Sequence, residues 1–280
     1  MRTFKEYALA YWDAGWSIFP LTPGEKTPHF DLLKRAGHVT RDGAGSWAPF
    51  ALKHITREQT AAFWDQDPNA NIGVACGRTS GITVIDIDVK NIPPEDFHDP
   101  EEIRFKVAPL TLTSFTGSGG MHLFCQYAAG IQNTTKRVHP QIDIKNDGGY
   151  IVLPPSIHPD TGLPYQFDQL TPWNTENVEA LAPFPEELKQ QVIKQEDDGV
   201  DWALVLRGVR QGIDGRNNMG AKLVGKLLHA IFLEFDYDQQ FLPFIWEFLR
   251  WWNIKNKPPM SERELEHIMK SITKRSLYGE

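Results

Sequence analysis

The spacing of hydrophobic residues divides the chain into a first part rich in strands and a last part rich in helices. Apolar residues at helical spacing predict helices at residues 4–15 and 57–64. Apolar and β-branched runs predict strands at residues 16–21, 71–76, 81–89, 110–116, 121–127, 141–145 and 149–153. Short turns rich in glycine or asparagine separate these runs, so we expect 71–76 to neighbour 81–89, 110–116 to pair with 121–127, and 141–145 to pair with 149–153.

The last part of the chain has helical spacing throughout. Helices are predicted at residues 217–235 and 238–252, the second with Pro243 near its start, where proline is tolerated. A third helix begins with Ser261 as N-cap and Glu264 three residues later, and Met260 and Leu265 are placed to form a hydrophobic staple. We therefore predict an α+β domain at residues 1–182, a partly helical linker at 183–200 and a small all-helical domain at 201–280.

The composition gives no signal for a membrane span, for secretion or for a disulfide or zinc framework. The 280 residues have room for two modest domains, and there is no apolar run of about 18 residues that could cross a membrane. The first residues lack the apolar core of a secretory signal, so we expect a cytoplasmic protein with no membrane partner. The two cysteines, Cys76 and Cys125, exclude a disulfide framework and a CxxC zinc ribbon, so no zinc is expected.

Charge is unevenly divided along the chain. The net charge of −7 comes from residues 1–200, with 17 Lys and Arg against 26 Asp and Glu, and from residues 201–280, with 12 against 10. Two acidic clusters, at residues 95–102 and 196–198, are interpreted as solvated loops or linker. Because local patches decide whether a protein binds nucleic acid, the net charge does not exclude a DNA partner.

The clearest candidate for chemistry is a pair of aspartates on the predicted strand 81–89. Residues two apart on a strand point to the same face, so Asp86 and Asp88 project together, with Cα atoms about 6.5 Å apart. Two bare carboxylates repel each other unless cations or basic groups neutralise them. The pair is either an ordinary exposed strand face or a ligand pair for divalent cations, and the apolar run around it favours metal binding.

Three further segments carry polar groups. The turn that contains Ser118 and Gly119 is followed by His122, and glycine-rich turns let backbone N–H groups approach phosphate. Asp143 and Lys145 share a strand face, either as a surface ion pair or as a third metal ligand beside a phosphate contact. Lys26, in a proline-bounded loop, is either solvated or in contact with an anion. Together, the three aspartates and the basic groups match the needs of phosphoryl transfer with two metal ions.

The order of these segments points to a known family. The series PGEKTPH, NIGVACG, VIDIDVK, FTGSGGMHLF and IDIKNDGGYIVLPPS, at residues 23–156, resembles the bifunctional primase-polymerase domain of the archaeo-eukaryotic primase superfamily. That family has a DxD-type, an SxH-type and an hD-type motif in this order. Asp86 and Asp88 match the first motif, His122 the second and Asp143 the third. Here two extra residues separate Ser118 from the histidine.

The resemblance implies a fold, a reaction and roles for the residues. The expected fold is an RRM-like antiparallel sheet with a second α/β subdomain, and the expected activity is DNA-templated primer synthesis and strand extension in a phage, plasmid or other mobile element. Mg²⁺ or Mn²⁺ would be held at a two-metal site by Asp86, Asp88 and Asp143. The incoming dNTP or NTP would be held by Ser118, Gly119, His122, Lys145 and Lys26.

Two stretches near the C-terminus, at residues 215–218 and 258–265, resemble the helical primase C-terminal domain. Longer relatives continue into a helicase, so the helicase is expected to be a separate polypeptide or to be missing from a fragment. Basic residues at 222, 226, 250, 255 and 257 accompany Trp251 and Trp252, a mixture that suits single-stranded DNA but also suits an aromatic core with solvated lysines. Candidates for contact with the template or the initiating nucleotide are Arg216, Asn217, Lys222 and Trp252.

Two other classes of function fit the same residues. A nuclease or phosphatase could use the same three aspartates for hydrolysis, although a triphosphate-sized glycine turn speaks against it. A replication-initiation module could bind origin DNA without catalysis, although the presence of all three aspartates speaks against that.

Overall fold

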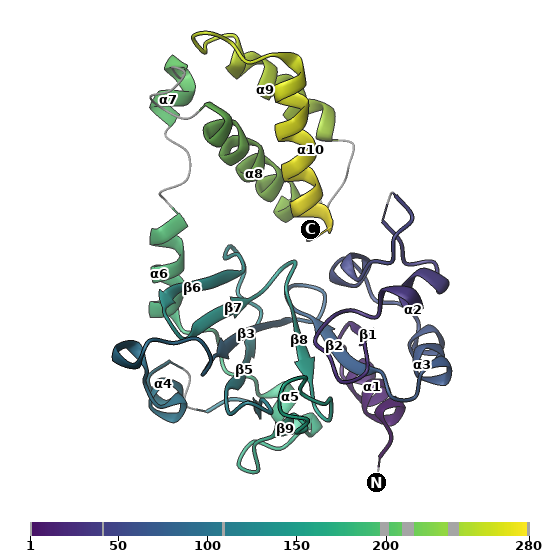
Figure 1. The fold of residues 1–280 in the computed structure, drawn as a ribbon. Helices are drawn as coiled ribbons and strands as arrows, with labels where there is room; N and C mark the ends of the chain where they lie inside the picture. The colour runs from purple at the N-terminus through teal and green to yellow at the C-terminus, as the bar shows by residue number, and fades with distance from the viewer. Residues whose placement is uncertain are drawn as a thin grey trace. The chain divides into compact units, whose positions relative to one another are not determined.

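The computed structural model describes residues 2–40, 42–107, 110–196, 202–208, 216–234 and 241–278 (Figure 1). The chain forms two compact units, Met1–Ile193 and Lys194–Glu280. Several predicted positions lie outside the described residues: the linker residues 197–200, Gly215, and the helix positions 235 and 238–240. The domain limits 1–182, 183–200 and 201–280 stay a prediction.

Three antiparallel strands form the smaller sheet of the first unit, in the order β1-β2-β8. Its strands are β1 (Ile18–Leu21), β2 (Asn71–Ala75) and β8 (Tyr150–Leu153). Helices α1 (Phe4–Asp13) and α3 (Arg57–Gln66) pack together and against this sheet, and α2 (Phe30–Arg35) follows β1. Thr3 and Thr56 form capping boxes that satisfy the first free backbone N–H groups of α1 and α3, so each helix begins where the sequence directs it.

Six antiparallel strands form the larger sheet, in the order β6-β7-β3-β5-β4-β9. The strands are β3 (Ile82–Ile87), β4 (Thr113–Phe115), β5 (Met121–Gln126), β6 (Thr134–His139), β7 (Ile142–Lys145) and β9 (Gln166–Phe167). The short elements η1 (Ala48–Ala51), η2 (Pro94–Asp96) and α5 (Thr175–Glu179) lie in its connections and those of the smaller sheet. The α+β class with antiparallel sheets is confirmed, whereas β6 was not predicted.

Two of the predicted strand pairs were wrong. β2 and β3 belong to different sheets, and so do β7 and β8. Each turn carries the chain from one sheet to the other, and Gly77 and Gly148 have φ angles of +99° and +76°, which glycine adopts without strain. A hydrogen bond joins these two turns, since the Arg78 N–H donates to Asp147 Oδ1 at 2.9 Å. The predicted pair β4 and β5 is confirmed.

Both faces of the larger sheet are buried. On one face, Ile85, Ile87 and Leu123 pack with Ile103 of α4 (Pro100–Val107) and with Leu188 of α6 (Glu186–Glu196). On the other face, side chains such as Ile82, Val84 and Phe124 share a core with the smaller sheet and its helices. This alternation follows from the period of two along a strand. It also sets the site, because Asp86 continues the row of Val84 toward the end of β3.

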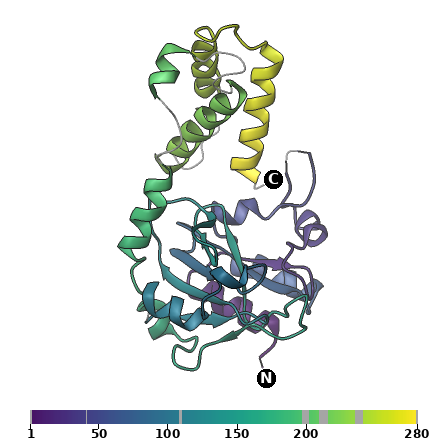
Figure 2. The same cartoon turned by 60° about the vertical axis from the view of Figure 1, so that its left-hand side comes forward.

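The second unit is helical. It contains α7 (Trp202–Arg207), α8 (Arg216–Glu234), α9 (Leu242–Asn253) and α10 (Glu262–Tyr278), and α8 and α10 lie side by side (Figure 2). The predicted capping box is confirmed, since the Ser261 N–H donates to Glu264 and the Glu264 N–H donates to Ser261. Pro243 lies in the first turn of α9, as expected. Among the described helices, none is long and apolar enough to cross a membrane.

Candidate active site

Strand register brings the main candidate residues into one row across the larger sheet. Asp86 on β3 lies directly opposite His122 on β5 and, on its other side, directly opposite Asp143 on β7. Partners in an antiparallel pair have their side chains on the same face, about 5 Å apart at Cβ. Residues separated by 57 positions in sequence, Asp86 and Asp143, thus become immediate neighbours on a rigid support.

Asp88 lies just beyond the end of β3. Its N–H donates to the Gln141 carbonyl at 2.8 Å, and its carbonyl accepts from the Gln141 side-chain amide at 3.1 Å. Gln141 is fully buried and therefore fixes the backbone of Asp88 next to β7. The carboxylate of Asp88 keeps the same face as Asp86 because the extended conformation continues past the strand.

Three carboxylates meet at this place. One carboxylate oxygen from each of Asp86, Asp88 and Asp143 lies within 4.8 Å of the other two. Burial, opposed by the charge of Lys145 and supported by that of Asp143, raises the pKa of Asp86 to about 6. Burial, and then the charges of Asp86 and Asp143, also raise the pKa of Asp88. A cluster of oxygen donors that resists ionisation in this way suits a hard divalent cation, whose charge would compensate it.

Lys145 is the basic partner inside the cluster. Its Nζ lies 2.9 Å from Asp143 Oδ2 and 3.9 Å from Asp86 Oδ2. Burial lowers the pKa of Lys145, but Asp86 and Asp143 outweigh burial, so the pKa is raised and the ammonium stays charged. Asp143 also accepts the Lys136 N–H at 2.9 Å through its other oxygen. One ammonium faces three carboxylates, which leaves the cluster short of positive charge.

His122 borders the carboxylates on the β5 side. Its Nε2 lies 3.6 Å from Asp86 Oδ1, and its Nδ1 lies 3.5 Å from the Ser114 hydroxyl. Burial, and then the charges of Lys26 and Lys145, lower the pKa of His122 to about 3. The ring is therefore neutral at physiological pH, so it can offer one N–H donor rather than a positive charge.

The glycine turn joins β4 to β5 and lies directly before His122 in sequence. Gly119 has a φ angle of +92°, and a Cβ on Gly120 would lie 2.5 Å from the Ile87 carbonyl oxygen, so both positions favour glycine. The Thr116 hydroxyl accepts the Gly120 N–H at 3.0 Å and lies 3.1 Å from the Ser118 hydroxyl. Ser118 is half-buried and Gly119 is exposed, so the tip of the turn is open beside the carboxylates.

Lys26 comes to the site from the smaller sheet. It lies in the loop after β1, which is held by the Asn71 side chain, donating to the Glu25 carbonyl at 2.9 Å, and by Tyr150, donating to the Lys26 carbonyl at 3.2 Å. The Lys26 side chain is exposed. Its charge lowers the pKa of Asp86 and of Asp88, although burial outweighs it in both. Lys26 is thus an exposed cation whose field reaches the carboxylates.

The sequence interpretation missed Tyr165 and His158. The buried Tyr165 ring has its centroid 5.8 Å from the His122 ring and 5.8 Å from the His158 ring. Burial, and then the charges of Asp86 and Asp88, raise the pKa of the Tyr165 hydroxyl far above its usual value. Among the described residues, His158 Nε2 is one of six buried side-chain nitrogen and oxygen atoms without a hydrogen-bond partner. A histidine and a tyrosine in the Pro- and Gly-containing segment after β8 were the available signal.

Two of the candidates in the helical unit, Trp252 and Arg216, have buried side chains. Trp252 is fully buried in the helical core and has no surface to offer a base, whereas its neighbour Trp251 is 42% exposed. Arg216 is also buried, and its guanidinium donates to the Pro258 carbonyl, so it joins two segments of the unit. Lys222 is exposed on α8.

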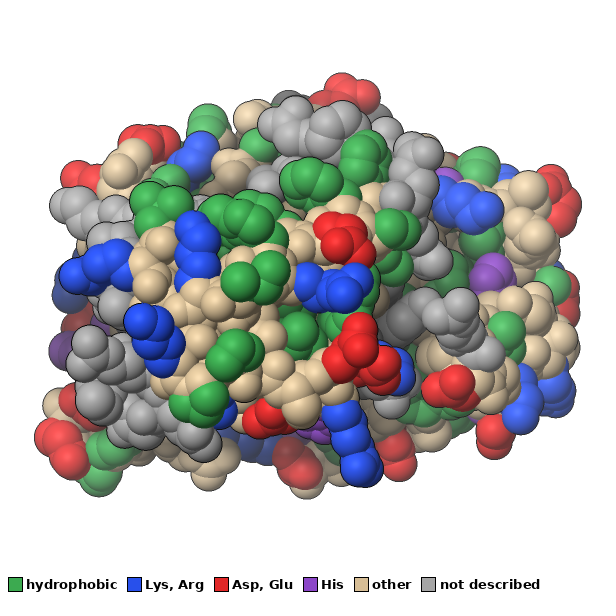
Figure 3. Space-filling model, turned by 90° about the horizontal axis from the view of Figure 1, so that it is seen from above, with side chains coloured by type: hydrophobic (Ala, Val, Ile, Leu, Met, Phe, Trp, Pro, Cys, Tyr) green, Lys and Arg blue, Asp and Glu red, His purple; other side chains and the backbone are tan. Residues whose placement is uncertain are grey.

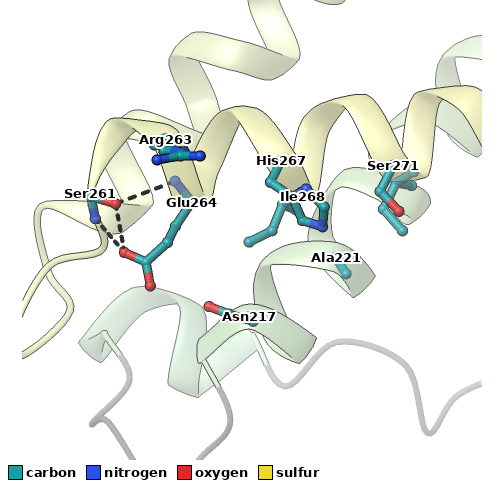
Figure 4. Close-up of a pocket in the computed structure, with 9 residues that line it drawn as sticks. Asn217, Ala221, Ser261, Arg263, Glu264, His267, Ile268 and Ser271 are labelled. Atoms are coloured by element: carbon teal, nitrogen blue, oxygen red, sulfur yellow. Dashed lines mark hydrogen bonds between the residues drawn. The ribbon is translucent and has the colours of Figure 1, made fainter.

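Asn217 is exposed and lines a pocket of about 500 Å³ between the start of α8 and α10 (Figure 4). Figure 4 shows Asn217 and Ala221 on one side, facing His267, Ile268 and Ser271 of α10. Among these helical-unit candidates, therefore, Asn217 and Lys222 keep an exposed side chain.

Comparison with known proteins matches both units. The family model described as bifunctional DNA primase/polymerase, N-terminal, matches residues 8–187. The model described as primase C terminal 1 matches residues 205–277. No curated protein matches the chain.

Proposed function

The chain belongs to the bifunctional DNA primase/polymerase family, and on that premise we propose that Asp86, Asp88 and Asp143 carry out its nucleotidyl transfer at a two-metal site. The family makes the protein a DNA primase/polymerase that uses a DNA template and nucleotides. The observation that supports the proposed site is the single row Asp143–Asp86–His122 across three paired strands.

The three carboxylates fit divalent cations, Mg²⁺ or Mn²⁺, because all three offer oxygen ligands within 4.8 Å of one another. Such ions, when bound, would activate the attacking 3′-hydroxyl and stabilise the charge of the leaving pyrophosphate. In the reaction, the 3′-hydroxyl gives up its proton to solvent and its oxygen forms a bond to the α-phosphorus. The bond between that phosphorus and the bridging oxygen of the β-phosphate breaks, and pyrophosphate leaves. Gln141 and the strand ladder hold the carboxylates in place, so little reorganisation is needed during the step.

The basic side chains beside the carboxylates are suited to the triphosphate. We assign Lys145, His122 and Lys26 to phosphate contacts, together with the turn residues Ser118 and Gly119. Lys145 retains its charge beside two carboxylates, and the neutral His122 supplies one hydrogen bond without competing with metal ions for the carboxylates. The exposed tip of the glycine turn leaves room for phosphate oxygens beside Ser118 and Gly119, while the Gly119 and Gly120 N–H groups donate to Thr116 and hold the turn in shape.

The deciding experiment combines two assays on one preparation. Wild-type protein with Mg²⁺ or Mn²⁺ is given unprimed single-stranded DNA, and separately a primed template, with all dNTPs and all NTPs. We expect new primers from the first substrate and extended primers from the second. Failure of both reactions, in the presence of folded protein, would contradict the proposed function.

The rival activities are tested with the same protein preparation in parallel reactions. A nuclease would shorten labelled DNA when nucleotides are omitted, whereas the proposed enzyme leaves the DNA intact. A non-catalytic initiation module would bind DNA and make no product. We further propose that the protein acts in the replication of a phage, plasmid or other mobile element.

A further inference from the structure

One side of α9 carries an aromatic stripe made of Phe244, Phe248 and Trp251. These residues are spaced four and three apart, so they lie along one side of the helix, next to the buried row of Ile245, Leu249 and Trp252. Phe244 is 59% exposed and Trp251 is 42% exposed. The ring centroids of Phe248 and Trp251 are 5.4 Å apart. Phe248 is partly buried against the helical core and supports the stripe, whereas Phe244 and Trp251 expose large aromatic surface, which is typical of a binding site.

Basic groups accompany the stripe. Lys255 Nζ lies 3.9 Å from the centroid of the Trp251 ring and also donates to the Leu206 carbonyl at 3.3 Å, which fixes the lysine over the ring. Arg250 precedes Trp251 in sequence, lies on a neighbouring side of α9 and makes an exposed ion pair with Glu247, which is worth little energy. Lys257 follows with an exposed side chain. Figure 3 shows hydrophobic and basic side chains next to one another on the face seen from above.

We propose that this aromatic stripe, with Arg250 and Lys255, is a binding surface for single-stranded DNA that holds the template. Bases stack on exposed aromatic rings without regard to sequence, and phosphates are held by neighbouring cations. The proposal rests on the proposed function only in naming the bound strand as the template. It moves the contact away from Trp252 and Arg216, which are buried, and onto the outer side of α9.

Charge favours DNA over an apolar protein partner. Lys255 places a positive charge at the Trp251 ring, and Arg250 and Lys257 lie nearby in sequence. Phosphate groups of a nucleic acid need such neighbouring cations, whereas an apolar protein partner does not. The stripe also contains Trp and Phe rather than Leu or Val, and only aromatic rings offer a flat face to a base.

The first test measures the binding of the full-length protein to a fluorescein-labelled single-stranded oligonucleotide by anisotropy. Trp251→Ala and Phe244→Ser should each weaken binding by about five-fold to 100-fold, since each variant removes one ring on which a base stacks. Trp251→Phe should retain most of the affinity, because it keeps a ring. The matched control Leu170→Ser removes an equally exposed apolar side chain, 85% exposed, from the catalytic unit and should bind like the wild type.

The second test separates charge from stacking. The double variant Arg250→Gln/Lys255→Gln should lower the slope of log Kd against log salt by about 0.7 for each phosphate that the variant no longer neutralises. Lys270→Gln on α10, whose lysine is 78% exposed, is the control and should leave the slope unchanged. Melting temperatures of all variants should remain close to that of the wild type, because the altered side chains are at the surface.

Wild-type affinity in Trp251→Ala and in the double variant would overturn the proposal. A change in oligomeric state with unchanged DNA affinity would likewise overturn it and identify a protein-docking surface. Primer extension by the same preparations distinguishes the two levels of inference. If the wild-type protein extends primers and the variants bind DNA as tightly as the wild type, only the proposed role of the stripe is rejected. If the wild-type protein does not extend primers, the proposed function itself is rejected.

Discussion

Asp86 faces His122 across adjacent antiparallel strands, with 3.6 Å between the carboxylate Oδ1 and the imidazole Nε2. Burial shifts the pKa values of the two side chains in opposite directions. It raises the pKa of Asp86 to about 6 and helps to lower the pKa of His122 to about 3. Burial therefore opposes charge on both groups. The site has a carboxyl group whose ionised form is disfavoured by burial, beside a neutral hydrogen-bond donor.

The raised pKa of Asp86 predicts a stability effect in metal-free protein. Since the folded pKa lies above the unfolded value of 3.8, the folded state binds the proton more tightly, and this contribution to stability is lost as pH rises through about 6. In EDTA at pH 7.5, Asp86→Asn should therefore be more stable than the wild type by roughly 1–3 kcal/mol. The difference should shrink toward zero near pH 4, as measured by urea unfolding.

The control for this measurement is Asp65→Asn, which alters a 61% exposed carboxylate in a surface ion pair with Lys5. It should change stability little at either pH. If Asp86→Asn were less stable than the wild type at pH 7.5 without metal, the carboxylate would be stabilised rather than strained by its surroundings. The proposed need for cations would then lose its physical basis.

His122→Ala is expected to raise the KM for nucleotide and to lower kcat. The imidazole N–H is assigned to a phosphate, and such a contact strengthens as charge develops in the transition state. His122→Gln, which keeps an N–H donor, should retain part of the activity. His54→Ala, in the loop before α3, serves as the control. A variant that altered only the affinity for DNA would place His122 on the template path instead.

Removal of the helical unit should separate initiation from extension. Joining the first two nucleotides forfeits more translational and rotational freedom than adding one nucleotide to a paired 3′ end, so initiation needs additional binding surface. We propose that residues 201–280 supply it and that truncation after residue 198 abolishes new primer synthesis but spares the extension of a primer. The first unit has its own hydrophobic cores, so it should remain folded. Equal loss of both activities would mean that the helical unit only stabilises the catalytic one.

Periodicity was enough to put Asp86 and Asp88 on one face of a strand, since that depends only on local alternation. It could not reveal that Asp143 would be the cross-strand partner of Asp86, because register is a long-range property. The pairing errors have a similar cause, since a glycine turn that reverses a hairpin looks the same in sequence as one that passes the chain to another sheet.

The sequence also could not predict which side chains of the helical unit are buried. Trp251 and Trp252 are adjacent and identical, and only the packing of α9 decides that Trp252 is buried while Trp251 is exposed. Arg216 was a candidate for contact with the template or the initiating nucleotide, yet it is buried and its guanidinium donates to the Pro258 carbonyl. Tyr165 was missed because a tyrosine after the last predicted strand has no pattern that links it to the aspartates.

The most direct test of the central claim is single-turnover addition of one labelled nucleotide to a primed template by Asp86→Asn, in saturating Mg²⁺ or Mn²⁺. The amide keeps the shape of the carboxylate but removes its charge and most of its affinity for a cation. We predict a rate at least about 10³-fold below that of the wild type, with Asp160→Asn, a surface carboxylate paired with Lys90, at the wild-type rate. A rate for Asp86→Asn within about ten-fold of the wild type would contradict the assignment of the three carboxylates as the site of nucleotidyl transfer.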